Sequence, residues 1–203
     1  MGNEINGAVR VGKDRHPGKI LLETSEILFR GDGFRLKIAF AEITGVAATD
    51  GELRVTGRSG TTVFEVGAAA EKWREKILHP KSRAEKLGVK NGMAVRLIGS
   101  FADDFLKELK AGKAQLLDKR SSESAAIAFL SIADKSGSVS IGKQAKKLKD
   151  DQALWVVYPK GKKEITEIEV IEAGRKAGLK DVKVVGFSTS HTALKFVIPL
   201  DQR

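Results

Sequence analysis

The first eighty residues contain short segments in which apolar and polar positions alternate with a period of two. In one of them Phe34, Leu36 and Ile38 would share a face, because successive side chains of a strand point to opposite sides. Turn-forming pairs such as Asp32-Gly33 and Asp50-Gly51 separate the segments. The segments that follow this pattern are 19–22, 26–30, 34–38, 43–48, 53–55 and 63–66. Short strands at about eight-residue spacing predict an antiparallel meander.

The pattern changes to a helical period after Gly67. Between residues 68 and 78, Ala69, Trp73 and Ile77 recur at every fourth position, and His79-Pro80 ends the segment. A meander followed by one amphipathic helix resembles the pleckstrin-homology superfold, in which that helix closes one end of a curled sheet. The resemblance implies that Trp73 is the core residue of this helix and that residues 1–80 form one module.

The same resemblance bears on the partner of this module. Phosphoinositide-binding members of the superfold carry a dense Lys/Arg cluster in their first hairpin loop. The first predicted loop here is Glu23-Thr24-Ser25, which has no positive charge. We therefore interpret the module as a surface for contact with another protein rather than with lipid.

Residues 81–203 alternate between predicted strands and predicted helices. We expect helices at 82–87, 101–109, 139–149 and 165–177, and strands at 94–98, 114–117, 125–132, 153–157, 182–187 and 193–198. Strands that alternate with helices favour a parallel sheet with helices on both faces, to which the last two strands add an antiparallel edge. The predicted fold is thus an α+β module, 1–80, followed by an α/β Rossmann-like domain, 81–203.

This second part resembles the methyltransferase-like Rossmann fold, on the segments GVKNGMAVRLIG (88–99) and AGLKDVKVVGF (177–187). That resemblance implies a glycine-rich loop after the first strand, where backbone N–H groups meet S-adenosylmethionine, and an acidic residue nearby. Here the loop is Ile98–Ala102, with one glycine, and Asp118 is the candidate acid after the second strand. Because Phe101 would fill the space that bare backbone should leave, we predict no cofactor.

The whole chain also resembles a bacterial two-domain family of unknown function. The matching segments are LLETSEILFRG, AAAEKWREKILHPKSRAEKLGV, ALWVVYPKGKKEITE, AGLKDVKVVGFS and HTALKFVIP. They span nearly the full length and are specific in combination. The family implies the two-domain plan and supplies no activity.

The composition of the chain indicates its cellular compartment and the charge of the partners it attracts. The chain has 41% hydrophobic residues, no cysteine and no apolar run long enough to cross a membrane, which indicates a cytoplasmic protein without disulfides or thiolate metal sites. The formal net charge is +10. Residues 1–80 hold 12 Lys/Arg and 11 Asp/Glu, and residues 81–203 hold 24 and 15. The second part therefore attracts anions, unless the lysines only keep the protein soluble.

Two polar segments supply the candidate site. Lys160 follows the strand 153–157, at the strand end where open α/β sheets bind ligands. Ser190, His191 and Lys195 lie in or after the polar segment 188–192, where His191 is the candidate for proton transfer. The remaining ligand-binding candidates are Gly99 and Ser100, after the first strand of the domain.

Three functional interpretations follow. The first is a non-catalytic binding or adaptor protein whose Rossmann-like domain has lost its cofactor loop. The second is a divergent, methyltransferase-like transferase acting on an anionic substrate, which requires a cavity lined by Gly99, Lys160 and His191 together. The third is a nucleic-acid-associated protein, for which the lysine-rich segment 143–149 is the candidate contact. No metal site is expected, because the histidines His16, His79 and His191 are far apart and no cysteine pair exists.

Overall fold

The computed structural model describes residues 3–118 and 121–203. It divides into two compact units, Met1–Lys81 and Ser82–Arg203. No helix in the described residues is long and apolar enough to cross a membrane.

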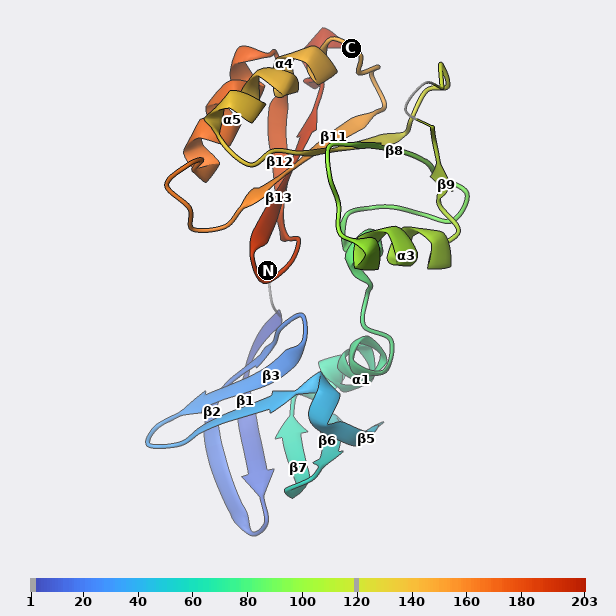
Figure 1. Ribbon diagram of the computed structural model, residues 1–203. Coiled ribbons are helices and arrows are strands. Elements are labelled where there is room, and N and C mark those ends of the chain that lie inside the picture. Colours follow the sequence, from blue (N-terminus) through green and yellow to red (C-terminus); the bar gives the residue numbers. More distant parts are fainter. Residues whose placement is uncertain (1–2, 119–120) are drawn as a thin grey trace. The chain divides into compact units, whose positions relative to one another are not determined.

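The first unit is an antiparallel sheet followed by one helix (Figure 1). Its elements are β1 (Asn3–Val11), β2 (Asp14–Leu22), β3 (Glu26–Gly31), β4 (Arg35–Ala39), β5 (Ile43–Thr49), β6 (Glu52–Gly57), β7 (Gly60–Glu65) and α1 (Ala70–Leu78), with short 3₁₀ turns at Phe40–Glu42 and Gly67–Ala69. The strand order is β4-β3-β2-β1-β7-β6-β5, so β1 joins the two halves of the sheet. Trp73 of α1 is 1% exposed and packs into the core formed by the strands.

The sequence analysis missed β1 and the first half of β2. Glycines interrupt their alternation, and the sheet explains why. A Cβ on Gly7 would lie 2.1 Å from the carbonyl oxygen of Glu65 on β7, and one on Gly18 would lie 2.5 Å from that of Arg30 on β3. Close approach between backbones therefore requires residues without side chains at positions where the pattern looked broken.

The first hairpin loop is accordingly Gly12-Lys13, between β1 and β2, and not the predicted loop at Glu23–Ser25. This loop carries one lysine. The flanking Arg10 and Arg15 form ion pairs with Glu65, and Arg10 also pairs with Glu52. Most of the positive charge at this end of the sheet is therefore neutralised within the unit.

The second unit has a mixed sheet with helices on both faces. Its elements are α2 (Arg83–Lys86), β8 (Ala94–Ile98), α3 (Asp103–Ala111), β9 (Gln115–Leu116), β10 (Ile127–Ser131), α4 (Val139–Ala145), β11 (Ala153–Pro159), α5 (Glu167–Lys176), β12 (Lys180–Gly186) and β13 (His191–Val197), with 3₁₀ turns at Lys135–Ser138 and Leu200–Gln202. The strand order is β12-β13-β11-β10-β8-β9. Strands β9, β8, β10 and β11 are parallel, whereas β13 runs antiparallel between β11 and β12. The predicted mixed α/β fold is confirmed.

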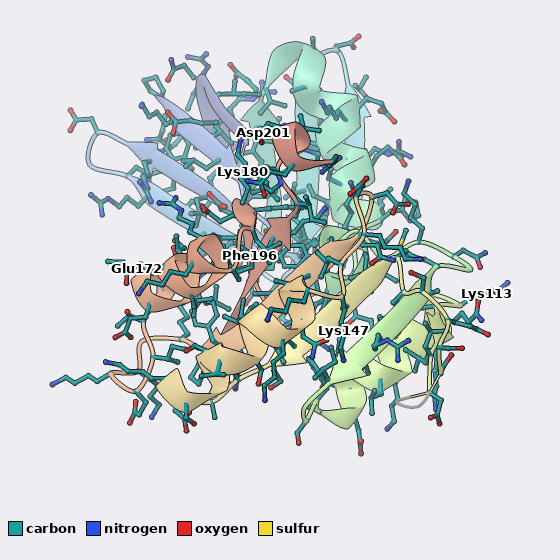
Figure 2. The ribbon with its side chains drawn as sticks, turned by 90° about the horizontal axis from the view of Figure 1, so that it is seen from above. Lys113, Lys147, Glu172, Lys180, Phe196 and Asp201 are labelled. Carbon is teal, nitrogen blue, oxygen red and sulfur yellow. The ribbon has the colours of Figure 1, made fainter. Side chains whose placement is uncertain are left out.

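The two faces of this sheet have separate cores. On one face Trp155 and Phe129 pack with α2 and α3, and the indole N–H of Trp155 donates to the carbonyl oxygen of Leu87 at 2.9 Å. On the other face Leu154 and Phe196 pack with α4 and α5. Figure 1 shows α3 on one side of the sheet and α4 and α5 on the other. Viewed from above in Figure 2, Phe196 lies within the unit, whereas Lys147 belongs to its surface.

Arg83 joins the short helix α2 to α3. It is 17% exposed, and its guanidinium donates to Glu108 at 2.9 Å and to Asp104 at 3.0 Å. The same group lies 4.9 Å from the ring centres of Phe105 and Phe187. One side chain therefore links two helices and the end of β12 through charge and ring contacts.

Candidate functional site

The carboxyl ends of β8, β10 and β11 meet at one edge of the six-stranded sheet. After β8 the chain moves to β9 on one side and then returns to β10 on the other. The strand order therefore reverses between β8 and β10. In open α/β sheets, ligands bind in the crevice outside the strand ends at such a reversal.

The loop after β8 brings Gly99 against the end of β10. Gly99 has φ +94°, a conformation that favours glycine, and a Cβ there would lie 2.9 Å from the carbonyl oxygen of Ser131. Ser100 follows it and is exposed. The glycine therefore serves a close contact between two strand ends at the reversal point.

Phe101 packs into the core of the unit. Its ring centre lies 5.8 Å from that of Phe105 on α3, 6.4 Å from that of Phe129 on β10 and 6.2 Å from that of Phe187. The expectation was a ring in the space above the glycine loop. Instead the ring is held among three other aromatic rings on the α3 face of the sheet, where it is partly buried.

The structure brings Lys160 and Ser190 together. His191 opposes Pro159 in the β11–β13 pair, and the backbone N–H of Lys160 donates to the carbonyl oxygen of Ser190 at 2.8 Å. The Ser190 hydroxyl lies 2.9 Å from Nδ1 of His191. Adjacent side chains of an extended chain would point apart, but Ser190 lies in the turn before β13, so the two groups can meet.

The backbone of this turn is fixed by Ser188. Its hydroxyl accepts from the backbone N–H groups of Ser190 at 3.2 Å and His191 at 3.0 Å. Among the described residues, no hydrogen bond or ion pair joins His191 to a carboxylate. The pair can donate or accept a hydrogen bond or move a proton, but it lacks the third member of a catalytic triad.

Lys195 lies apart from these residues. It is in the middle of β13, opposite Trp155 on β11 and Lys183 on β12. It lies four positions after His191, which corresponds to about 13 Å along a strand. The structure therefore does not join Lys195 to the Lys160, Ser190 and His191 group.

Asp134 is a strand-end residue that the sequence analysis missed. It follows β10, and its carboxylate accepts from the Ser136 hydroxyl at 2.6 Å and from the backbone N–H of Gly137 at 3.1 Å. These hydrogen bonds lower the pKa of Asp134 below its ordinary value. Asx-type turns are common, so the sequence alone could predict Asp134 only as an ordinary capping residue.

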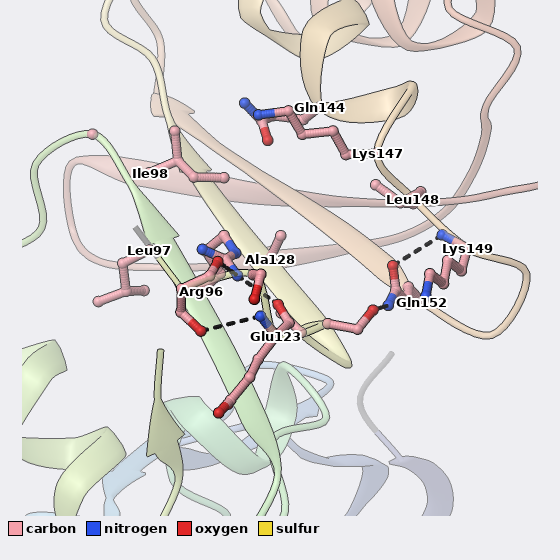
Figure 3. A pocket seen from close by; sticks show the side chains of 15 residues that line it. Arg96, Leu97, Ile98, Glu123, Ala128, Gln144, Lys147, Leu148, Lys149 and Gln152 are labelled. Atoms are coloured by element: carbon pink, nitrogen blue, oxygen red, sulfur yellow. Dashed lines mark hydrogen bonds between the residues drawn. The ribbon is translucent and has the colours of Figure 1, made fainter. Parts of the chain in front are cut away.

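A cavity of about 580 Å³ lies beside α4 (Figure 3). Gly99 lines this cavity, but Lys160 and His191 do not. It is therefore not the cavity that the transferase interpretation requires, which all three residues would line together. Sequence analysis did not single out the lining residues Arg96, Gln144 and Gln152. The sequence contained one indication of this cavity. Only a short connection, 118–124, with no predicted helix, joins the predicted strands 114–117 and 125–132.

The candidate nucleic-acid segment does not form one basic helix. Helix α4 ends at Ala145, and Lys147 and Lys149 lie in the following turn, where they line the cavity. The described residues contain no group of three or more metal-ligating side chains.

No protein-family model matches the chain, and no curated protein matches it by sequence. The resemblance to a bacterial family of unknown function therefore stays a prediction.

Several solved structures are similar to the chain. A SAM dependent methyltransferase from Aquifex aeolicus has 17% identity and TM-score 0.44, over 62% of this chain and 89% of that one. A TehB-like SAM-dependent methyltransferase from Corynebacterium glutamicum has 10% identity and TM-score 0.36, over 64% and 96%. The C-terminal domain of an unknown protein from Leishmania infantum has 11% identity and TM-score 0.34, over 38% and 80%. Such distant similarity does not assign an activity.

Proposed function

We propose that the second unit is a methyltransferase-like Rossmann domain and that the protein is a divergent transferase acting on an anionic substrate. The observation that carries the proposal is the strand order. A reversal point lies between β8 and β10, and an antiparallel strand is inserted between β11 and β12 at the far side. Open α/β sheets with such an order bind ligands in a crevice outside the strand ends, and Gly99, Lys160 and His191 all lie at that edge of this sheet.

Within this proposal each strand-end residue has a role. Lys160 supplies positive charge for the substrate anion, and His191, hydrogen-bonded to Ser190, moves a proton. Helix α3 begins with Asp103 and with Asp104, whose carboxylate is paired with Arg83, so Asp103 supplies the negative charge where a dinucleotide would place its pyrophosphate. The Asp103 carboxylate disfavours a dinucleotide and favours a donor without phosphate, such as S-adenosylmethionine.

A second candidate is a domain that binds ligand without catalysis. Two observations favour it: the loop after β8 has one glycine, and His191 has no carboxylate partner in the described residues. Together with this second candidate, we propose that the first unit provides a surface for another protein. The strand order and closing helix of this unit are typical of a pleckstrin-homology-like module.

Calorimetric titration of the full chain with S-adenosylmethionine and S-adenosylhomocysteine tests the first candidate. We expect saturable binding that Ser100→Trp weakens at least tenfold, because the indole would occupy the strand-end crevice. Lys107→Trp, on the exposed side of α3, is the control and should bind as the wild type does. Absence of binding to both compounds overturns the transferase and leaves the non-catalytic candidate.

A further inference from the structure

The cavity beside α4 lies next to the connection between β9 and β10, whose described residues form no helix. Helix α3 connects β8 to β9, helix α4 connects β10 to β11, and helix α5 connects β11 to β12. Between β9 and β10 the described residues, 117–118 and 121–126, contain no helix. The α4 side of β8 is therefore left uncovered next to α4, and the opening is within the size range of small-molecule sites.

Arg96 fixes one wall of this cavity. Its guanidinium donates to the backbone carbonyl oxygens of Asp118 at 3.1 Å, Ser121 at 3.0 Å and Glu123 at 2.7 Å. Gln152 fixes the neighbouring wall, because its side chain accepts from the backbone N–H of Lys149 at 2.9 Å and donates to Ser124. The walls are thus held in place by side-chain hydrogen bonds, which limits what a ligand would have to order on binding.

The lining combines an apolar floor with an excess of positive charge. Ile98 and Ala128 are partly exposed on the sheet, and Leu148 borders them from the turn after α4. Figure 3 shows Gln144 and Lys147 on the opposite side of the cavity from Arg96 and Glu123. The charged lining residues are Arg96, Lys147 and Lys149 against Glu123. No ion pair within the described part of the chain involves either lysine.

We propose that this cavity binds an organic phosphate of mononucleotide size. The planar ring of this ligand packs on Ile98 and Ala128, and Lys147 and Lys149 neutralise the charge of its phosphate group. A planar ring matches the flat surface of two neighbouring strands, and ammonium groups that lack a carboxylate partner are suited to phosphate. The cavity shares Gly99 with the strand-end edge, but neither Lys160 nor His191 lines it, so phosphate binding there does not require the proposed transferase activity.

Calorimetric titration of the full chain with AMP, adenosine and inorganic phosphate tests the proposal. AMP should bind saturably, and adenosine and phosphate should each bind at least tenfold more weakly, because each offers one half of the interactions. The double variant Lys147→Ala/Lys149→Ala should lose at least tenfold in AMP affinity. The matched control Lys143→Ala/Lys146→Ala removes the same charge from the same segment outside the cavity lining and should retain wild-type affinity.

A variant that fills the cavity gives an independent readout. Ala128→Leu should abolish AMP binding while circular dichroism and the melting temperature show a folded protein. His191→Ala should bind AMP as the wild type does, which separates this site from the strand-end site. The proposal is overturned if AMP does not bind saturably, if both lysine pairs weaken binding equally, or if Ala128→Leu leaves binding unchanged.

Discussion

Gly174 in α5 is predicted to be intolerant of the smallest side chain. An ideal Cβ at this position would lie 2.0, 2.5 and 2.7 Å from three atoms of the Phe196 ring on β13. Phe196 is 0% exposed, so its ring has no open space into which to move. Gly174→Ala should therefore cost about 3 kcal/mol in overpacking, the upper end of the usual range.

Helix propensity opposes this cost. Alanine is favoured over glycine by about 1 kcal/mol in a helix interior, so the expected net loss is about 2 kcal/mol. Gly142 in α4 provides a matched control, because a Cβ there meets nothing within 4 Å. Gly142→Ala should stabilise the second unit by about 0.5–1 kcal/mol. The same substitution in two neighbouring helices should thus have opposite signs.

Urea unfolding followed by tryptophan fluorescence can measure both variants. The chain has two tryptophans, and Trp155 is the one in the second unit, where it is 1% exposed. A Trp73→Phe background therefore makes fluorescence a reporter of that unit. With a slope of about 2 kcal/mol per molar urea, Gly174→Ala should lower the midpoint by about 1 M and Gly142→Ala should raise it by up to about 0.5 M.

The reasoning is refuted if Gly174→Ala is as stable as the parent or more stable. Such a result would mean that α5 does not pack on the Phe196 ring as described. A second measurement supports the mechanism: adding Phe196→Leu should cost less in the Gly174→Ala background than in the parent, because the smaller side chain relieves the overlap.

Three further predictions concern packing and charge. Urea unfolding should show that Arg83→Lys lowers the free energy of unfolding by about 1–2 kcal/mol, because lysine cannot reproduce the forked contacts of Arg83. Arg83→Met should lower it by about 3 kcal/mol, because Glu108 loses its cationic partner and keeps only the hydrogen bond from the backbone N–H of Ala84. Lys135 and the backbone N–H of Thr166 hold the pKa of Glu169 at about 2, below its ordinary 4.5. The stability that this carboxylate supplies is complete above its ordinary pKa and is lost as pH falls toward 2. The melting temperatures of the wild type and Glu169→Gln should therefore differ at neutral pH and converge in acid. A difference in melting temperature that stays constant with pH would contradict this. Trp73→Ala should destabilise the first unit by about 3–5 kcal/mol in circular dichroism melts while the Trp155 emission of the second unit stays native, and an unchanged melt would exclude Trp73 as its core residue.

Local signals in the sequence predicted the elements that depend on neighbouring residues. The helical period around Trp73 predicted α1, and the apolar run 153–157 predicted the buried strand β11. Ser82 and Gly178 mark helix ends at which the structure has a capping hydrogen bond and a left-handed backbone. These features are encoded within a few residues, so the sequence alone could determine them, and with them the mixed α/β class.

The candidate site depended partly on tertiary structure. The sequence predicted Lys160 after a strand and Lys195 within one, but the pairing of Lys160 with Ser190 and the separation of Lys195 from both required the register between β11 and β13. A shift of one residue in that register would move every side chain of β13 to the other face. Register is set by packing across the sheet, and no local pattern specifies it.

The glycines show the same division between local and distant causes. No local pattern explains Gly7, Gly18 or Gly174, because each is required by a backbone or a ring far away along the chain. The cavity beside α4 likewise arises from how β8, β10 and α4 assemble around a connection without a described helix. Periodicity predicted most of the strands and helices but not β1, whose alternation glycines interrupt. Close approach between distant segments, which only the folded chain creates, decided strand order, the glycine positions and the cavity.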